Sequence, residues 1–157
     1  MKPPPWLVLG VGNASRGDDA LGPLLLERLR DAGVEAAGDV ELLEDFQLQL
    51  EHALDLRDRL GVLFVDAGRP GHADGASLSP IDADAAIVPA SHGLRPQAVL
   101  HVARRIDGKV PPAWLLAIEG VEFGLGVVPS AAARRHLEDA VVLARGWLQA
   151  RRLGAAG

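Results

Sequence analysis

The stretch Leu7–Gly22 constrains the fold most, because a short apolar run ends in glycines and is followed by two adjacent acids. The run Trp6–Val11 has the length and the apolar content of a buried strand. Gly10 and Gly12 then predict a tight loop, and the leucine-rich segment beyond Gly22 predicts a helix. A strand, a glycine loop and a helix in this order are typical of the first unit of an α/β fold.

The glycine loop does not match a dinucleotide-binding loop. Gly17 follows Gly12 by five residues, whereas the dinucleotide fingerprint has its third glycine three residues after the second. Asp18 and Asp19 would also repel a pyrophosphate at the helix N-terminus. We therefore expect this loop to suit a cation better than a phosphate.

A simpler interpretation is that Asp18 or Asp19 caps the helix that follows. Asp is a favoured N-cap residue, and Pro23 is tolerated in a first helical turn. One cap needs only one acid, and the sequence indicates no structural role for the second.

The rest of the chain alternates between strand and helix patterns. Strands are expected at Trp6–Val11, Val40–Glu44, Gly61–Asp66 and Ala113–Ile118, with a short edge strand at Ala76–Ile81. Helices are expected at Ala20–Ala32, Leu48–Arg59, Pro96–Ile106 and Ser130–Leu153, with Ser130 as an N-cap and Gly154–Gly157 frayed. The pattern predicts an α/β fold, a three-layer α/β/α sandwich around a mostly parallel twisted sheet of about five strands, and residues 1–157 as a single domain.

Composition argues against several classes of protein. The chain has 16 Lys and Arg against 21 Asp and Glu, a net charge of −5 and no basic run, so we expect no nucleic acid and no membrane surface as partner. The absence of cysteine excludes disulfides, thiolate metal sites and a cysteine nucleophile. The first residues contain no apolar signal sequence, so the expected location is cytoplasmic.

Several motifs together carry a family resemblance. Val8–Asn13 followed by Gly17–Gly22 resembles the N-terminal signature of the hydrogenase maturation proteases, which trim the large subunit of nickel-iron hydrogenases. The family's second acidic strand end, its histidine segment and its last strand are similar to Phe64–Ala67, Ser91–Leu94 and Pro112–Phe123. The resemblance covers roughly Trp6 to Leu148.

The resemblance implies where a site would lie. In open α/β sheets, ligands bind beyond the carboxyl ends of strands where the strand order reverses. The first and third strands would be neighbours there, so Asp19 and Asp66 would face one crevice that His92 can reach. The family's nickel-binding positions fall on Asp19, Asp66 and His92, with Asp19 and Asp66 as the catalytic carboxylates. Many family members have Glu, one methylene longer, at the position of Asp19, and Asp18 is the alternative first ligand.

Other residues of the first loop are candidates for contact with the substrate, namely Asn13, Ser15, Arg16 and Asp18. Ser15 could donate a hydrogen bond to the substrate, and Arg16 could contact a carboxylate. Each candidate has a plainer alternative: a turn residue for Ser15, an exposed cation for Arg16, a turn cap for Asp66 and a loop histidine for His92. The remaining histidines, His52, His101 and His136, are expected to be surface or packing residues on helices, and His72 is a weak candidate in a loop.

The function implied by the resemblance is that of an endopeptidase. It would remove a C-terminal extension from the nickel-loaded precursor of a hydrogenase large subunit, recognising nickel that the substrate carries, while zinc or cadmium could occupy the same site. Either a carboxylate acts as general base on water or the metal polarises the carbonyl. The alternatives are a non-catalytic metal-binding maturation chaperone and a nucleoside or nucleotide hydrolase. The hydrolase is disfavoured because 4% aromatic residues and no Tyr leave little for base stacking.

Overall fold

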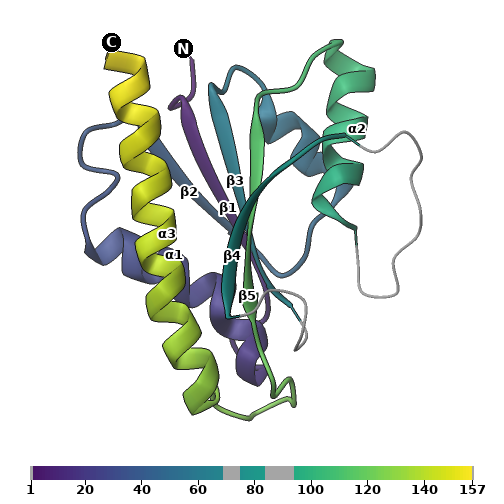
Figure 1. Cartoon of the computed structure of the whole chain (residues 1–157). Coiled ribbons are helices and arrows are strands. Elements are labelled where there is room, and N and C mark those ends of the chain that lie inside the picture. Colours follow the sequence, from purple (N-terminus) through teal and green to yellow (C-terminus); the bar gives the residue numbers. More distant parts are fainter. Residues whose placement is uncertain (1, 69–74, 84–93, 157) are drawn as a thin grey trace.

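The computed structural model describes residues 2–68, 75–83 and 94–156 and contains one five-stranded sheet (Figure 1). The strand order is β2-β1-β3-β5-β4, with β1, β2, β3 and β5 parallel and β4 antiparallel at the edge. Their bounds are β1 Trp6–Val11, β2 Val40–Asp45, β3 Gly61–Gly68, β4 Ala76–Ile81 and β5 Ala113–Glu119. The predicted mostly parallel sheet, including its edge strand, is confirmed.

Helices cover both faces of the sheet. They are α1 Leu21–Asp31, α2 Pro96–Asp107 and α3 Ala131–Ala156, with 3₁₀ segments η1 Gly17–Ala20 and η2 Leu50–Leu56. Side chains of β1 alternate between the two faces: Val8 packs in one cluster with α1 and α3, and Leu7 and Leu9 pack in another with α2 and η2. The predicted α/β/α sandwich is therefore confirmed.

The central strands β1 and β3 are buried on both faces, which explains why they appear in the sequence as continuous apolar runs. β1 lies between β2 and β3. The connection after β1 leads to the strand on one side of β1, and the connection after β2 leads to the strand on its other side. This reversal of strand order puts the carboxyl ends of β1 and β3 next to each other, as predicted.

The predicted helix Leu48–Arg59 is wrong in type and length, because the segment forms the 3₁₀ helix η2. Leu50 and Leu54 are exposed, whereas Ala53 and Leu56 are buried. A spacing of three residues between buried positions fits a 3₁₀ helix.

The expected fraying of Gly154–Gly157 is also wrong for the described residues, because α3 continues to Ala156. Arg152 explains the order of its last turns: the guanidinium donates to both carboxylate oxygens of Asp39 at 2.8 Å and to the carbonyl of Val34 at 2.8 Å. Within the described ranges, no helix combines the length and the apolar content needed to cross a lipid bilayer.

A tryptophan cluster lies at the end of the sheet where the parallel strands begin. Trp6 begins β1 and Trp114 lies near the start of β5, and both meet Trp147 of α3 edge to face with ring centroids 6.2 Å and 5.6 Å away. The guanidinium of Arg151 lies 4.4 Å from the ring centroid of Trp114. These contacts pack α3 against the end of the sheet that lies opposite the carboxyl ends of the parallel strands.

Candidate active site

The loop after β1 folds back so that Gly12 lies against η1. Gly12 has φ 149°, and a Cβ atom there would lie 2.0 Å from the carbonyl oxygen of Asp19. The half-buried Asp19 is fixed by its carboxylate, which accepts the backbone N–H of Asn13 at 2.9 Å. The glycine in the motif thus allows the close approach that places Asp19 at the carboxyl edge.

Asp18 has a different role from its neighbour, because its side chain is fully buried. Its carboxylate accepts the N–H groups of Val121 (2.6 Å), Glu122 (2.9 Å) and Ser130 (2.7 Å) and the Ser130 hydroxyl (2.9 Å). Burial alone would raise the pKa of Asp18, but these hydrogen bonds lower it below its usual value. Asp18 therefore holds the β5–α3 connection.

This finding corrects two expectations. Asp18 was a candidate for substrate binding and for the first metal ligand, but its carboxylate is buried and occupied by four donors. Neither Asp18 nor Asp19 caps a helix, since η1 and α1 have no side-chain cap hydrogen bond. Ser130 does cap α3, as predicted: its hydroxyl accepts the N–H of Ala133 at 3.1 Å.

Asp66 lies near the carboxyl end of β3, the strand next to β1. Burial and then the negative charge of Asp19 raise the pKa of the Asp66 carboxyl to about 7, while the N–H of Ala67 opposes the shift. The structure thus brings Asp19 and Asp66 within electrostatic reach of each other at the point where the strand order reverses.

The third predicted ligand, His92, lies outside the described residues, as do Ser91 and His72. Among the residues that the structure describes, no group of three His, Cys, Asp or Glu side chains could hold a metal ion. The described part of the site therefore supplies two carboxylates. Hard oxygen donors of this kind suit a divalent cation and leave coordination positions for other ligands.

The candidate substrate residues lie on the surface of the same loop. Ser15 and Arg16 are exposed and Asn13 is half-buried. The side-chain oxygen of Asn13 accepts the N–H of Ser15 at 2.9 Å, and the carbonyl of Ser15 accepts the N–H of Gly126 at 2.7 Å. These contacts shape the loop and leave the side chains of Ser15 and Arg16 at the surface.

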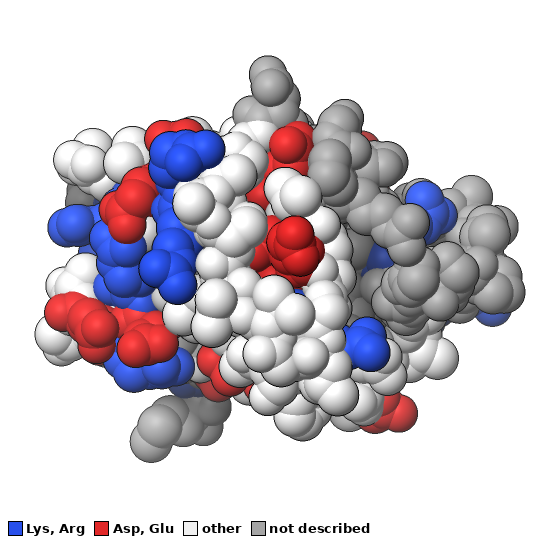
Figure 2. All heavy atoms as spheres, turned by 90° about the horizontal axis from the view of Figure 1, so that it is seen from below, with Lys and Arg blue, Asp and Glu red and all other residues white. Residues whose placement is uncertain are grey.

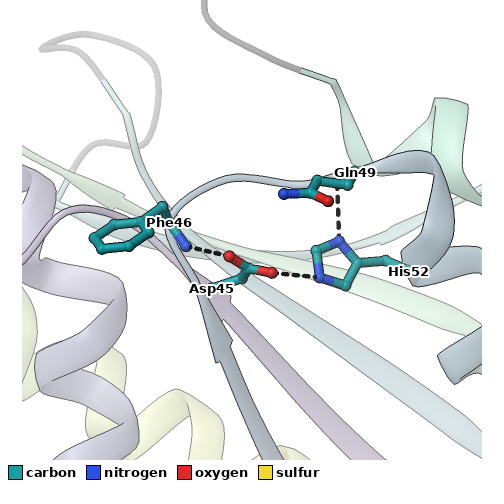
Figure 3. Close-up of polar contacts among 4 residues, drawn as sticks. All are labelled: Asp45, Phe46, Gln49 and His52. Carbon is teal, nitrogen blue, oxygen red and sulfur yellow. Dashed lines mark hydrogen bonds and ion pairs between the residues drawn. The ribbon is translucent and has the colours of Figure 1, made fainter.

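Sequence reasoning missed a polar network at the end of β2 (Figure 3). His52 is buried, its Nε2 lies 3.1 Å from the carboxylate of Asp45, and its Nδ1 accepts the N–H of Gln49 at 2.8 Å. Because Nδ1 accepts, the ring proton lies on Nε2 and is donated to Asp45. Both ring nitrogens are occupied, so His52 is not free to transfer a proton to a substrate.

The network adjoins the first loop through the backbone, because the carbonyl of Asp45 accepts the N–H of Gly12 at 3.1 Å. Gln49 and His52 also cap η2 reciprocally. The signal in the sequence was the spacing of a Gln and a His three residues apart, the pattern of a capping box with His in place of Glu.

Figure 2 views the molecule from below, with acidic side chains in the middle of this face and uncharged residues around them. A separate hollow of about 400 Å³ lies elsewhere, between residues 32–34 and the last turns of α3. This hollow lies near the amino ends of the parallel strands, away from Asp19 and Asp66. The interaction between the carboxylates of Asp19 and Asp66, and not this hollow, marks the candidate site.

Comparison with known proteins gives matches by structure. No family model matches the sequence, and no curated protein matches it at a significant level. The NiFe hydrogenase maturation protease HycI of Thermococcus kodakarensis superposes with a TM-score of 0.68 at 24% identity, covering 90% of this chain and 91% of that one. The hydrogenase maturating endopeptidase HybD of E. coli gives 0.68 at 22% identity, covering 96% and 94%.

A third solved structure, the hydrogenase 2 maturation peptidase of a Thaumarchaeota archaeon, has a TM-score of 0.66 at 21% identity and covers 91% of this chain and 97% of that one. These matches extend over nearly the full length of every chain compared, and they agree with the resemblance that the motifs carry. The chain therefore has the fold of the hydrogenase maturation proteases.

Proposed function

We propose that this protein is an endopeptidase that removes the C-terminal extension from the nickel-loaded precursor of a nickel-iron hydrogenase large subunit. The observation that carries the proposal is the approach of Asp19 and Asp66 at the carboxyl edge between β1 and β3. In a fold shared with maturation proteases, this is the place where an α/β sheet binds its ligand.

The roles of the site residues follow from the charges of their side chains. Asp19 and Asp66 together supply negative charge for a cation, and His92 is proposed as the third ligand. Nickel belongs to the substrate in this proposal, so binding it would place the adjacent peptide bond in the crevice. Positioning of this kind lowers a barrier by up to ~7–11 kcal/mol in favourable cases. The attacking water would lose its proton to Asp19 or Asp66.

The test is incubation with a large-subunit precursor in its nickel-loaded and nickel-free forms, followed by mass spectrometry. We expect loss of the extension from the nickel-loaded form only. Asp66→Asn should abolish the cleavage, whereas Asp107→Asn should not, because Asp107 accepts hydrogen bonds from Arg57 at the far end of α2. Binding without a change in mass would instead indicate a chaperone, and hydrolysis of nucleosides would indicate the nucleoside hydrolase.

A further inference from the structure

The connection between β5 and α3 is unusually apolar for an exposed segment. Within residues 121–128, the exposed apolar side chains are Val121, Leu125, Val127 and Val128, with Leu125 at 70% and Val128 at 69% exposure. Single exposed apolar residues are common, but a concentration in one short segment is typical of a binding surface. We call this segment the apolar wall.

The apolar wall is fastened to the loop that carries Asp19. The buried carboxylate of Asp18 accepts the N–H groups of Val121 and Glu122, and the N–H of Asp18 donates in return to the carbonyl of Glu122. The N–H of Gly126 donates to the carbonyl of Ser15 at 2.7 Å. The two segments are therefore joined at the start of the wall and again at Gly126.

Glycines allow this close approach. Gly17 has φ 56°, and a Cβ atom there would lie 2.4 Å from the carbonyl oxygen of Glu122. A Cβ atom on Gly120 would lie 2.7 Å from the Cβ of Asp18. Any side chain at either position would push the apolar wall away from the loop.

The buried hydrogen bonds of Asp18 are explained if the apolar wall has to keep a fixed position against the Asp19 loop. Burying a carboxylate is unfavourable unless its oxygens are hydrogen-bonded, and Asp18 meets that condition by binding the wall. An exposed apolar segment that is ordered before binding loses less conformational entropy when a partner docks. A fixed wall thus favours contact with a specific chain.

We propose that the apolar wall binds apolar side chains of the precursor polypeptide beside the bond that is cut, and that Asp18 is the positioning residue that holds the wall against the Asp19 loop. This inference rests on the proposed function. The precursor polypeptide is the expected ligand because the apolar wall lies beside the Asp19 loop, and an extended chain advances ~3.3 Å per residue. A peptide bound at Asp19 therefore reaches the wall, which touches the adjacent Asp18, within a few residues.

The first test replaces wall side chains. In Leu125→Ser/Val128→Ser we expect the KM for the nickel-loaded precursor to rise about tenfold, with kcat and the affinity for free nickel unchanged, because only apolar contacts are lost. The matched control is Val142→Ser on α3, where the side chain is 71% exposed outside the wall, and its KM should equal that of the unmodified protein.

The outcomes separate this inference from the proposed function. Failure of the unmodified protein to cleave would overturn the proposed function and the inference with it. Normal cleavage with an unchanged KM in the double variant would overturn the inference alone. Sedimentation velocity provides a further check, because dimerisation lost in the double variant would assign the wall to a second copy of this chain and also overturn the inference.

The second test addresses Asp18. Asp18→Asn and the milder Ser130→Ala, which removes one donor and the α3 cap, should raise KM more than they lower kcat. The control is Arg152→Met, which loses the hydrogen bonds to Asp39 and Val34 at the other end of α3. It should lower the unfolding midpoint without changing KM. An equal KM in Ser130→Ala, Arg152→Met and the unmodified protein would contradict the positioning role.

Discussion

Asp19 and Asp66 come from different elements, yet the negative charge of Asp19 acts on the carboxyl of Asp66. Burial, and after it this charge, raise the pKa of Asp66 to about 7. Two carboxylates held this way repel each other when both are ionised, and a bound cation relieves the repulsion. The metal-free protein is therefore less stable when both groups are charged.

The stability of the metal-free protein should fall with rising pH because of Asp66. Its pKa is 3.8 in the unfolded reference and about 7 in the folded protein, so the folded state binds more protons between these values. The stabilising effect is complete below about pH 4 and is lost as pH rises through 7. Roughly three pKa units at ~1.4 kcal/mol each give an upper limit of ~4 kcal/mol.

Asp66→Asn should remove this dependence. At pH 8 we expect the variant to exceed the unmodified protein in unfolding free energy, and at pH 4 the advantage should disappear, as measured by urea denaturation without metal. Asp107→Asn serves as the control, because its carboxylate is paired with Arg57. A constant difference between Asp66→Asn and the unmodified protein from pH 4 to 8 would contradict the raised pKa.

Asp19→Asn should lower the pKa of Asp66. The substitution removes the negative charge that contributes to the shift, while the amide oxygen of Asn can still accept the N–H of Asn13. Carbon-13 NMR titration of the side-chain carboxyl groups measures the change directly. An unaltered Asp66 titration would show that the two carboxylates do not interact.

Nickel binding by the precursor-free protein should weaken as pH falls below 7. A cation needs ionised carboxylates, so a proton on Asp66 competes with it, and the affinity should fall about tenfold per pH unit well below that pKa. Isothermal titration calorimetry between pH 5.5 and 8 gives the slope. His92→Ala should abolish the single site, and unchanged binding in that variant would exclude His92 as a ligand.

His52→Leu should destabilise the protein without altering the shape of its pH–rate profile. The substitution leaves the N–H of Gln49 and the Asp45 carboxylate without the ring, which we expect to lower the unfolding free energy by ~1–3 kcal/mol. Both ring nitrogens are occupied, so no proton transfer is lost. Disappearance of one limb of the profile would instead assign His52 a role in proton transfer.

Local patterns predicted the strands well, because burial on both faces leaves β1 and β3 as continuous apolar runs bounded by glycine or acid. The pairing of Asp19 with Asp66 came from the motif and the rule for parallel sheets. The role of Asp18 was not predictable locally, since its partners lie 103 to 112 residues away. The sequence predicts an α-helix at η2 because a short apolar segment fits both helix types, and only the burial of Ala53 and Leu56, three residues apart, distinguishes the 3₁₀ helix.

The three tryptophans of the chain all belong to the cluster at the end of the sheet where the parallel strands begin, and the chain contains no tyrosine. Trp6 opens β1, so the five remaining residues of the strand separate this cluster from the loop with Asp19, a distance of roughly 17 Å. Intrinsic fluorescence therefore reports whether α3 is packed on the sheet and is insensitive to events at the opposite edge. A single optical signal can follow denaturation of any site variant without interference from metal or peptide.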